Sequence, residues 1–407
     1  MDIFEVGGAV RDSLLNEPVT ERDWVVVGSS AEELRSLGYR QVGKDFPVYL
    51  HPHSGEEYAL ARTEKSVGAG YHGFTFDISP DVSLEEDLGR RDLTINAMAR
   101  DKDGRIVDPF GGQHDIDARI LRHTSPAFSE DPLRILRVAR FASRLSRLSF
   151  TIAPTTMKLM LNMVAAGEMD ALRPERVWQE TEKALAEDRP DIYFETLREC
   201  GALGKVFPEI NALFGIPQPP RWHPEVDTGI HTLMCVRMAA RLSADSAVRF
   251  AALTHDLGKA TTPKDILPQH TGHGCRSVEL LDVFCNRFPV PRRHKELACA
   301  VAKYHGVVHR ADELRPSTVL KLFEAVDGIR RPERFEALLI ACGADARGRK
   351  GLEEKDYPQR RRLEHALMAA LKVDTKILAA TAQGRELGEV IRQQRLAAIG
   401  KALEEFS

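Results

Sequence analysis

The fold is decided by a stretch near the start of the chain, where residues 7–12 read Gly-Gly-Ala-Val-Arg-Asp and residues 21–28 read Glu-Arg-Asp-Trp-Val-Val-Val-Gly. The paired glycines form a turn that opens a segment with helical spacing, and the later β-branched run predicts a strand. Side chains two apart on a strand share a face, so Glu21 and Asp23 should point the same way, with Cα atoms about 6.5 Å apart. Two such carboxylates can hold a pair of divalent ions for a phosphoryl displacement.

The glycine turn just upstream supports this interpretation. An acidic-x-acidic triplet alone is more often a solvated strand end. Glycines such as Gly8 let backbone N–H groups approach a triphosphate closely. The guanidinium of Arg11 can donate charge-assisted hydrogen bonds to the same triphosphate. The two features together favour a nucleotide site over a solvated edge.

These residues resemble the head of the nucleotidyltransferases of the DNA polymerase β superfamily, in the branch that holds CCA-adding enzymes and bacterial poly(A) polymerases. The resemblance implies that Gly8 and Arg11 hold the incoming nucleotide and that Glu21 and Asp23 hold Mg²⁺. Glu21 stands where many relatives have aspartate, which keeps the carboxylate but moves it one methylene further out.

Length and composition describe an ordinary multidomain protein. The 407 residues are enough for two or three domains, and the net charge of −3 gives no global attraction to nucleic acid. The six cysteines form no Cys-x-x-Cys pair, which argues against a zinc ribbon and a disulfide framework. We see no signal peptide and no apolar run near the roughly 20 residues that span a bilayer, so we expect a cytoplasmic protein without membrane contact.

The rest of the first 125 residues alternates strand-like and helix-like patterns. A short helix is expected over residues 31–37, and residues 46–51 and 57–62 alternate apolar and polar residues as paired strands do. Glu57 is a candidate third carboxylate because the apolar residues that alternate with it would face the opposite side. Glu56 is the competitor, and similarity to the acidic strand of the family favours Glu57.

Residues 65–88 are rich in glycine, serine and aspartate and predict a mobile loop. The loop is long for a compact head, which favours a functional role over a bland connector. In the family that these residues resemble, this loop helps complete CCA enzymes switch from adding C to adding A. Its presence therefore favours the complete activity.

Residues 90–99 read Arg-Arg-Asp-Leu-Thr-Ile-Asn-Ala-Met-Ala and place two arginines at the start of a helix-like segment. The arginines could hold a triphosphate, or they could pair with the acidic residues at 85–87. Similarity to the Arg-Arg-Asp-x-Thr-x-Asn-Ala motif of the family favours Arg91 as a nucleotide ligand. The Asp-Pro-Phe-Gly-Gly turn at 108–112 resembles the hinge that follows the head.

A second informative stretch covers residues 129–147. We expect a helix capped by Ser129 with acidic residues in its first turn and Pro132 tolerated there. At about 100° per residue the apolar residues gather on one arc and the arginines on the other. The arginines are Arg134, Arg137, Arg140, Arg144 and Arg147. Such stripes are usually solvated basic faces.

Asp131 and Arg134 lie three residues apart, so we expect neighbouring side chains on this helix. Together they offer an acceptor and a planar donor fork, which could read a base edge without a template. The family's Glu-Asp-x-x-Arg motif implies that this pair selects CTP or ATP, while Arg137 and Arg140 hold the phosphates and sugar. A wrong base would leave a polar group unpaired at a cost of about 1–3 kcal/mol. Residues 173–180 resemble the neck motif that follows, with a bracing role.

After a proline-rich connector at 216–220 the chain carries histidines and aspartates in a suggestive order. His231 lies early in a helical segment, and His255-Asp256 ends another. A lone histidine on a helix is usually packed or exposed, but this combination favours a metal site. Further candidates downstream are His270, His273, His305 and Asp345. Imidazole and carboxylate together suit nickel, cobalt, manganese or zinc.

This half resembles the HD-superfamily phosphohydrolases, whose signature is His…His-Asp…Asp. His231, His255 and Asp256 fit that signature, and we expect Asp345 and His305 to complete the site. The implied chemistry is attack of a metal-activated water on a phosphate ester. The combination of the two halves is similar to the gammaproteobacterial multifunctional CCA proteins, which add 2′,3′-cyclic phosphodiesterase, 2′-nucleotidase and phosphatase activities.

The predicted fold is an α+β nucleotidyltransferase head of the polymerase β type, followed by a mostly α-helical remainder. The predicted domains are the head at 1–125, a helical neck for nucleotide selection and RNA binding at 126–215, the HD domain at 216–350 and a helical tail at 351–407.

The predicted function is template-free addition of CCA to the 3′ end of tRNA from CTP and ATP, with Mg²⁺ at the head. The HD domain would use Ni²⁺ or another transition metal, and we expect a monomer or a homodimer. The catalytic residues are Glu21, Asp23, His255 and Asp256. Two rivals remain: a poly(A) polymerase-type tailing enzyme, which usually carries a long basic tail, and a tRNA-binding HD phosphohydrolase with an inactive head.

Overall fold

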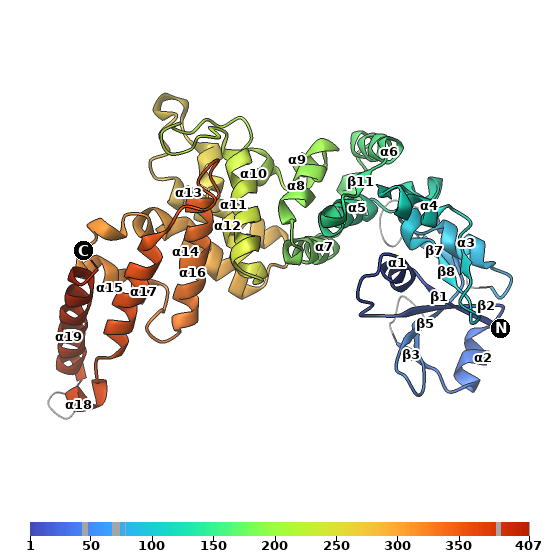
Figure 1. Cartoon of the computed structure of the whole chain (residues 1–407), viewed down its shortest axis with the longest axis horizontal. Helices are drawn as coiled ribbons and strands as arrows, with labels where there is room; N and C mark the ends of the chain where they lie inside the picture. The colour runs from blue at the N-terminus through green and yellow to red at the C-terminus, as the bar shows by residue number, and fades with distance from the viewer. Residues whose placement is uncertain (43–47, 67–73, 78, 380–383, 407) are drawn as a thin grey trace. The chain divides into compact units, whose positions relative to one another are not determined.

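The computed structural model describes residues 1–42, 48–66, 74–77, 79–379 and 384–406, and the chain divides into two compact units (Figure 1). Unit 1 comprises Met1–Thr181 and Ile192–Val206, and unit 2 comprises Glu182–Asp191 and Phe207–Ser407. Unit 1 contains the β-sheet, and the elements of unit 2 are helices within the described residues. The prediction of an α+β head followed by a mostly helical remainder is therefore confirmed.

A seven-stranded mixed sheet forms the centre of the head, with strand order β3-β4-β5-β2-β1-β8-β9. The strands are β1 (Asp2–Val6), β2 (Asp23–Val27), β3 (Arg40–Val42), β4 (Val48–Leu50), β5 (Glu57–Leu60), β8 (Ala99–Arg100) and β9 (Ile106–Val107). β2 pairs antiparallel with β1 and parallel with β5. β4 and β5 pair antiparallel, which confirms the predicted strand pair in this region.

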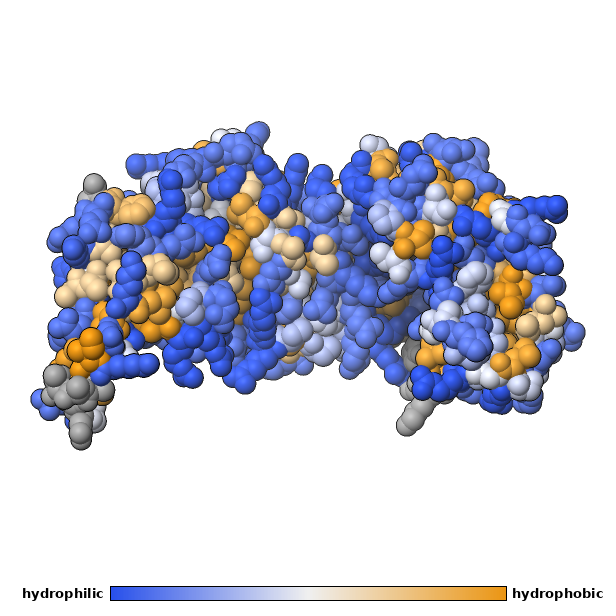
Figure 2. Space-filling view, turned by 60° about the horizontal axis from the view of Figure 1, so that its bottom comes forward, coloured by the Kyte–Doolittle hydropathy of each residue, from blue (hydrophilic) through white to orange (hydrophobic). Residues whose placement is uncertain are grey.

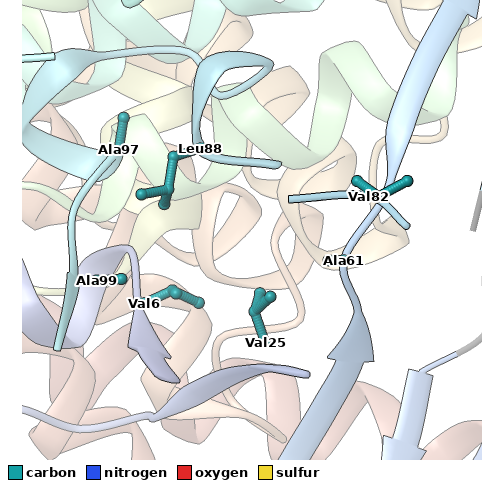
Figure 3. Packing of buried hydrophobic residues seen from close by; sticks show 7 residues of the cluster. All are labelled: Val6, Val25, Ala61, Val82, Leu88, Ala97 and Ala99. Atoms are coloured by element: carbon teal, nitrogen blue, oxygen red, sulfur yellow. The ribbon is translucent and has the colours of Figure 1, made fainter. Parts of the chain in front are cut away.

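The valine run of β2 supplies both hydrophobic cores of the head, because successive side chains of a strand point to opposite faces. Val25 packs with Val6, Leu88 and Ala99 on one face, as Figure 3 shows. Val26 packs on the other face in a cluster that includes Leu34. A strand buried on both sides lies naturally at the centre of the sheet.

The remaining elements of unit 1 surround this sheet and continue into a helical region. They are α1 (Gly8–Leu14), α2 (Ala31–Ser36), β6 (Thr63–Ser66), β7 (Phe74–Asp77), α3 (Leu84–Gly89), α4 (Gly112–Asp117), β10 (Ile120–Leu121), α5 (Leu133–Arg144), β11 (Thr151–Ile152), α6 (Pro154–Ala165), α7 (Pro174–Ala186), α8 (Pro190–Glu199) and α9 (Ala202–Val206). α7 and α8 are divided between the two units. Ser30 caps α2 by accepting a hydrogen bond from Glu33 N, as expected for that helix.

Two expectations for the region from 65 to 99 are wrong. Residues 65–88 are not one loop, because β6 and β7 pair antiparallel and α3 begins at Leu84, held by a capping box between Ser83 and Glu86. The glycines at 68 and 70 lie outside the described residues. Arg90 is the C-cap of α3, so the two arginines follow a helix end and do not open a helix.

The expected start of the next helix is also wrong. A 3₁₀ turn over Pro126–Glu130 is capped by Ser125, and α5 begins only at Leu133 with Pro132 at its N-cap. No acidic residue occupies the first turn of α5. Proline cannot donate the hydrogen bond that would continue the earlier turn, so the helix restarts after it. The expected apolar arc of this helix is buried, as predicted.

Unit 2 is built from α10 (Pro208–Asn211), α11 (Thr228–Leu242), α12 (Ser246–Thr254), α13 (His273–Arg287), α14 (Arg292–Val308), α15 (Pro316–Ala325), α16 (Pro332–Arg347), α17 (Pro358–Leu371), α18 (Thr375–Ala379) and α19 (Gly384–Glu404). α11, α12 and α16 pack against one another, and α12 and α16 also pack against α14. Small residues such as Ala239, Ala252 and Ala344 lie at this junction with Met238. These small side chains let the backbones of the packed helices approach one another closely.

Hydrophilic residues cover most of the face drawn in Figure 2, with apolar residues in scattered groups. Among the residues that the structure describes, no helix combines the length and the apolar character required to cross a membrane.

Arg249 on α12 explains why residues 182–191 pack with unit 2. Its buried guanidinium donates 2.7 Å hydrogen bonds to the carbonyl oxygens of Leu185 and Glu187 and a 2.8 Å bond to that of Ser243. One side chain thus satisfies carbonyl groups at the end of α7 and beyond α11. A planar guanidinium with five N–H donors is suited to this.

Replacing Arg249 with Met should lower the free energy of unfolding by about 1.5–3 kcal/mol, because several buried carbonyl groups lose a charged donor. Arg237→Met on the exposed face of α11 is the matched control and should change the free energy of unfolding by less than about 0.5 kcal/mol. Denaturant unfolding followed by circular dichroism measures both. Equal effects of the two substitutions would contradict this role of Arg249.

Candidate functional site

The carboxylates predicted for the head lie where the interior strands β2 and β5 begin. We call this end of the sheet, with Glu21, Asp23 and Glu57, the carboxylate edge. Asp23 is the first residue of β2, and its Cα partner on the parallel strand β5 is Glu57. Paired residues of neighbouring strands share a face, and the strands lie about 4.8 Å apart. Glu21 precedes the strand, so its expected place within β2 is wrong. All three residues are exposed to solvent.

The charges of Glu21 and Arg91 both act on Asp23. Partial withdrawal from water and the nearby charge of Glu21 raise the pKa of Asp23, against the opposing effect of Arg91. Glu56, the competing candidate, accepts a 3.0 Å hydrogen bond from Ser54 in the preceding turn. Carboxylates on neighbouring strands near one arginine are oxygen donors of the kind that a hard divalent cation such as Mg²⁺ prefers.

The glycine turn lies between two guanidinium groups. Gly7 has φ +70°, and a Cβ atom built on it would lie 3.0 Å from Arg91 Nη1. A Cβ atom on Gly8 would lie 3.5 Å from Arg11 Nη2. Glycine therefore provides both the left-handed backbone and the space beside the arginines, which is the arrangement that a phosphate group needs.

Arg11 and Arg91 are fixed by buried acidic and amide groups. Arg11 donates hydrogen bonds of 2.8 and 3.0 Å to Asp12 and another to Asn96 Oδ1. Arg91 Nη2 donates a 3.0 Å bond to Asp87, which also binds Arg90. The alternative interpretation, in which Arg90 and Arg91 pair with an acidic residue at 85–87, therefore describes part of their contacts.

The arginines of α5 are not a solvated basic face. Arg137 Nε donates a 2.7 Å hydrogen bond to Asp92, whose other oxygen accepts a 3.0 Å bond from Asn96. Arg140 Nε donates a 2.6 Å bond to Glu180. Burial tends to raise the pKa of Asp92, but the charge of Arg137 and the hydrogen bonds from Asn96 and Arg137 hold this pKa far below its ordinary value. The network joins the segment after α3 to α5 and α7.

The expected side-chain pair of Asp131 and Arg134 is arranged differently. Asp131 accepts hydrogen bonds of 3.2 and 2.7 Å from the fork of Arg176 on α7, while Arg134 Nη1 donates to the carbonyl oxygen of Ala127. Because α5 begins at Leu133, Asp131 lies before the helix and does not follow its side-chain spacing. The neck motif thus braces Asp131 directly.

In unit 2, four histidines present the same ring nitrogen to a common buried region. His255 and His305 bind backbone carbonyl oxygens through Nδ1 at 2.8 and 2.9 Å, and His273 does so at 2.8 Å. His231 Nδ1 lies 3.1 Å from the carbonyl oxygen of Gly348. These contacts fix the tautomer that leaves each Nε2 ready to bind a metal.

Two carboxylates join these nitrogens. Asp345 Oδ1 lies 3.1 Å from His231 Nε2 and 3.8 Å from His255 Nε2, and Asp256 Oδ2 lies 3.1 Å from His255 Nε2. Asp256 Oδ1 lies 3.3 Å from His273 Nε2 and 3.7 Å from His305 Nε2. The structure therefore brings together the five residues of the expected site and His273, another of the sequence candidates, whereas the two ring nitrogens of His270 contact Thr262 and the Pro217 carbonyl oxygen.

The buried oxygens of Asp256 show that the donor set fits a metal ion. Neither oxygen accepts a hydrogen bond of acceptable geometry within the described part of the chain, although Lys259 Nζ lies 2.6 Å from Oδ2. His255 Nε2 is likewise without one. Buried polar atoms that converge without hydrogen bonds, in a set of imidazoles and carboxylates, suit a borderline transition metal.

Sequence reasoning missed the residues that hold these ligands. Glu225 Oε1 lies 2.9 Å from His231 Nδ1, from which it can accept a hydrogen bond, and 3.2 Å from His223 Nδ1. Although burial would raise it, hydrogen bonds from these histidines hold the pKa of Glu225 well below its ordinary value. His309 Nε2 lies 2.6 Å from Asp345 Oδ2. The His-Pro-Glu sequence at 223–225 was the available signal.

Comparisons with known families divide the chain in the same order. The family described as "Poly A polymerase head domain" matches residues 3–122. "Probable RNA and SrmB- binding site of polymerase A" matches residues 149–214, and "HD domain" matches residues 228–344. The first match holds the carboxylate edge, and the third ends one residue before Asp345.

Relatives match over the full length. Two curated proteins named Multifunctional CCA protein are 58% identical to the chain: one from Thioalkalivibrio sulfidiphilus over 407 residues, 100% of both chains, and one from Nitrosococcus oceani over 404 residues, 99% of both chains. A solved structure of the Thermotoga maritima CCA-adding enzyme complexed with tRNA shares the fold, with a TM-score of 0.64 and 21% identity over 100% of this chain and 90% of that chain. A solved structure of a CCA-adding enzyme in complex with CTP also shares the fold, with a TM-score of 0.64 and 20% identity over 99% of this chain and 90% of that chain.

Replacing Glu225 with Ala should weaken transition-metal binding by about 10- to 100-fold, because His231 loses the carboxylate that orients its ring. Calorimetric titration of the metal-free protein with Ni²⁺ measures the change. Glu354→Ala, which removes an exposed carboxylate of the same unit, is the control and should leave the affinity unchanged. Unaltered Ni²⁺ affinity in Glu225→Ala would contradict the orienting role.

Proposed function

The chain belongs to the family of multifunctional CCA proteins, and we propose that its two sites carry out two separate reactions on the 3′ end of tRNA. The head is a tRNA nucleotidyltransferase that adds and repairs CCA from CTP and ATP without a template and releases pyrophosphate. The HD domain hydrolyses terminal 2′- or cyclic phosphates. The observation that carries the first assignment is the position of Asp23 opposite Glu57, beside Glu21 and Arg91. A tRNA substrate fits a cytoplasmic location.

We assign the reacting end of the nucleotide to the carboxylate edge. Glu21 and Asp23, with Glu57 as the third carboxylate, would hold Mg²⁺ there. When bound, Mg²⁺ neutralises the triphosphate and lowers the pKa of the attacking 3′-hydroxyl. The glycine turn at Gly8 and the guanidinium groups of Arg11 and Arg91 would bind the phosphates.

Base selection is assigned to the start of α5 and the residues before it. Asp131 would supply acceptors and Arg134 donors toward the base edge once nucleotide binding replaces their contacts with Arg176 and the Ala127 carbonyl oxygen, while Arg137 and Arg140 would bind the sugar and phosphates. Arg137 and Arg140 each donate a hydrogen bond from Nε to an acidic residue, Asp92 and Glu180 respectively. A guanidinium has five N–H donors in all. Bound acids therefore position these arginines while leaving donors that can bind a nucleotide.

The HD domain would bind one or more transition-metal ions through His231, His255, Asp256 and Asp345, with His305 and His273 close to Asp256. Within this set, His231, His255 and Asp345 form one compact group that also contains Cys235, and Asp256 forms a second group with His273 and His305. Such an ion, Ni²⁺ in our proposal, would supply a water molecule with a lowered pKa. His255 and Asp256 would orient that water toward the phosphorus atom. Free 2′,3′-cyclic nucleotides and tRNA with a cyclic phosphate end are the substrates of this class.

A poly(A) polymerase-type enzyme with the same head is the second candidate, since the matched head family is named for poly(A) polymerase. Incubation with tRNA lacking its CCA end and with single labelled nucleotides separates the two. We expect CTP to be added first and ATP only after it. Long A-tracts without dependence on CTP would favour the second candidate.

Replacing Glu57 with Gln should lower the rate of CCA addition by on the order of 100-fold, because a metal ligand loses its charge. Glu56→Gln is the matched control on the neighbouring residue and should stay within about threefold of the wild-type protein, since Glu56 faces the turn. Single-turnover addition of CMP to truncated tRNA measures both.

If Glu56→Gln has the larger effect, the third carboxylate is misassigned. If Asp23→Asn leaves CCA addition unaltered, the metal assignment of the whole edge is wrong. In both cases hydrolysis at the HD domain in the same preparation reports that the protein is folded.

Replacing His255 with Ala should abolish Ni²⁺-dependent hydrolysis of 2′,3′-cyclic AMP, because the ring supplies one of the convergent nitrogens. CCA addition should remain within about twofold of wild type, since the head uses other residues. Hydrolysis with added Ni²⁺ and after chelation measures the first activity. Equal hydrolysis by wild type and His255→Ala under both conditions would contradict the proposal and favour an inactive HD fold.

A further inference from the structure

An exposed aromatic side chain lies in the loop that precedes α11. Trp222 is 57% exposed, whereas Trp178 is 4% exposed and Trp24 stacks on Tyr58 at a centroid distance of 5.6 Å. The guanidinium of Arg221 lies 4.8 Å from the centre of the Trp222 ring. An exposed indole with a guanidinium over its ring offers a flat surface on which a nucleobase can stack.

The backbone of Trp222 is tied to the metal ligands. Arg349 Nη1 donates a 3.2 Å hydrogen bond to the carbonyl oxygen of Trp222, and Nη2 donates a 3.1 Å bond to Asp345 Oδ1. The next residue, His223, packs edge-on against the ring of His231 at a centroid distance of 4.6 Å. One guanidinium and one ring contact thus place the loop at the rim of the metal site.

The loop itself is closed by internal hydrogen bonds. Trp222 N donates to the Pro219 carbonyl oxygen at 3.0 Å, and Gln218 N donates to that of Val226 at 2.7 Å. The side-chain oxygen of Gln218 accepts a 2.5 Å bond from Lys259, whose Nζ lies 2.6 Å from Asp256. The indole is therefore exposed on a backbone that is held in place and linked to the metal site.

We propose that Trp222 is a nucleobase platform for the HD site: it stacks on the base of the nucleotide whose 2′- or cyclic phosphate is hydrolysed. This inference rests on the proposed hydrolytic function and names what that site recognises. Indole rings stack on any base, and a guanidinium beside the ring strengthens such binding. The ligand is a nucleoside 2′-phosphate or 2′,3′-cyclic phosphate, either free or at an RNA 3′ end.

Hydrolysis kinetics with two substrates test the stacking. For 2′,3′-cyclic AMP, Trp222→Ala should raise KM about 10- to 100-fold with little change in kcat, and Trp222→Phe should restore most of the affinity. For ribose 2′,3′-cyclic phosphate, which has no base, KM should stay within twofold of wild type. Equal losses on the base-bearing and base-free substrates would overturn the proposal.

Tryptophan fluorescence provides a second readout that does not depend on activity. Titration of the Ni²⁺-loaded protein with 2′-AMP should quench the emission, and Trp222→Phe should remove the quenching. Trp24→Phe, which removes the indole in the head, should keep it. Quenching that persists in Trp222→Phe would overturn the proposal.

These experiments separate the inference from the function beneath it. If the wild-type protein hydrolyses neither substrate, the hydrolytic function fails while fluorescence still decides whether Trp222 binds a base. A third substrate, tRNA ending in a 2′,3′-cyclic phosphate, identifies the source of the base. A larger KM effect of Trp222→Ala on this tRNA than on free cyclic AMP assigns the base to the RNA 3′ end, and an equal effect assigns it to the nucleotide alone; both support stacking.

Discussion

A buried carboxylate must be compensated, and this requirement organises both units of the chain. In unit 1 the oxygens of Asp92 are satisfied by Asn96 and Arg137, so the acid fixes a guanidinium in place. In unit 2 the oxygens of Asp256 lie near Lys259 and several imidazoles, without hydrogen bonds of acceptable geometry in the described structure. The same constraint thus fixes an arginine in one unit and leaves a set of donors that suits a metal ion in the other.

The two sites follow different chemistry because their donors differ in charge and burial. The head offers exposed carboxylates at a sheet edge, which suit a strongly hydrated cation shared with a triphosphate. The HD domain offers buried imidazoles with fixed tautomers, which suit a transition metal that retains an open position for water. The chain thus combines a nucleotidyltransferase head with an HD domain whose donors suit a different class of metal ion.

Much of this was readable from sequence because the informative residues are close in the chain. The Gly-Gly turn, the valine run of β2 and the pair His255-Asp256 were found by local spacing alone. Contacts outside a regular spacing were not: Arg176 binds Asp131 from 45 residues away, and Glu225, in the loop just before α11, contacts His231 without any periodic pattern to reveal it. Local rules also misplaced the start of α5, since Pro132 interrupts the pattern, and they read β6, β7 and α3 as one loop.

We propose that the carboxylates where β2 and β5 begin, with Asp23 opposite Glu57, hold the divalent ions of nucleotide addition. Anomalous diffraction from crystals grown with Mn²⁺ and CTP tests it most directly, because Mn²⁺ replaces Mg²⁺ and its position is seen independently of activity. The account predicts anomalous peaks within coordination distance of Asp23 and its neighbouring carboxylates, next to the triphosphate. Bound CTP with Mn²⁺ located away from Asp23 would contradict it.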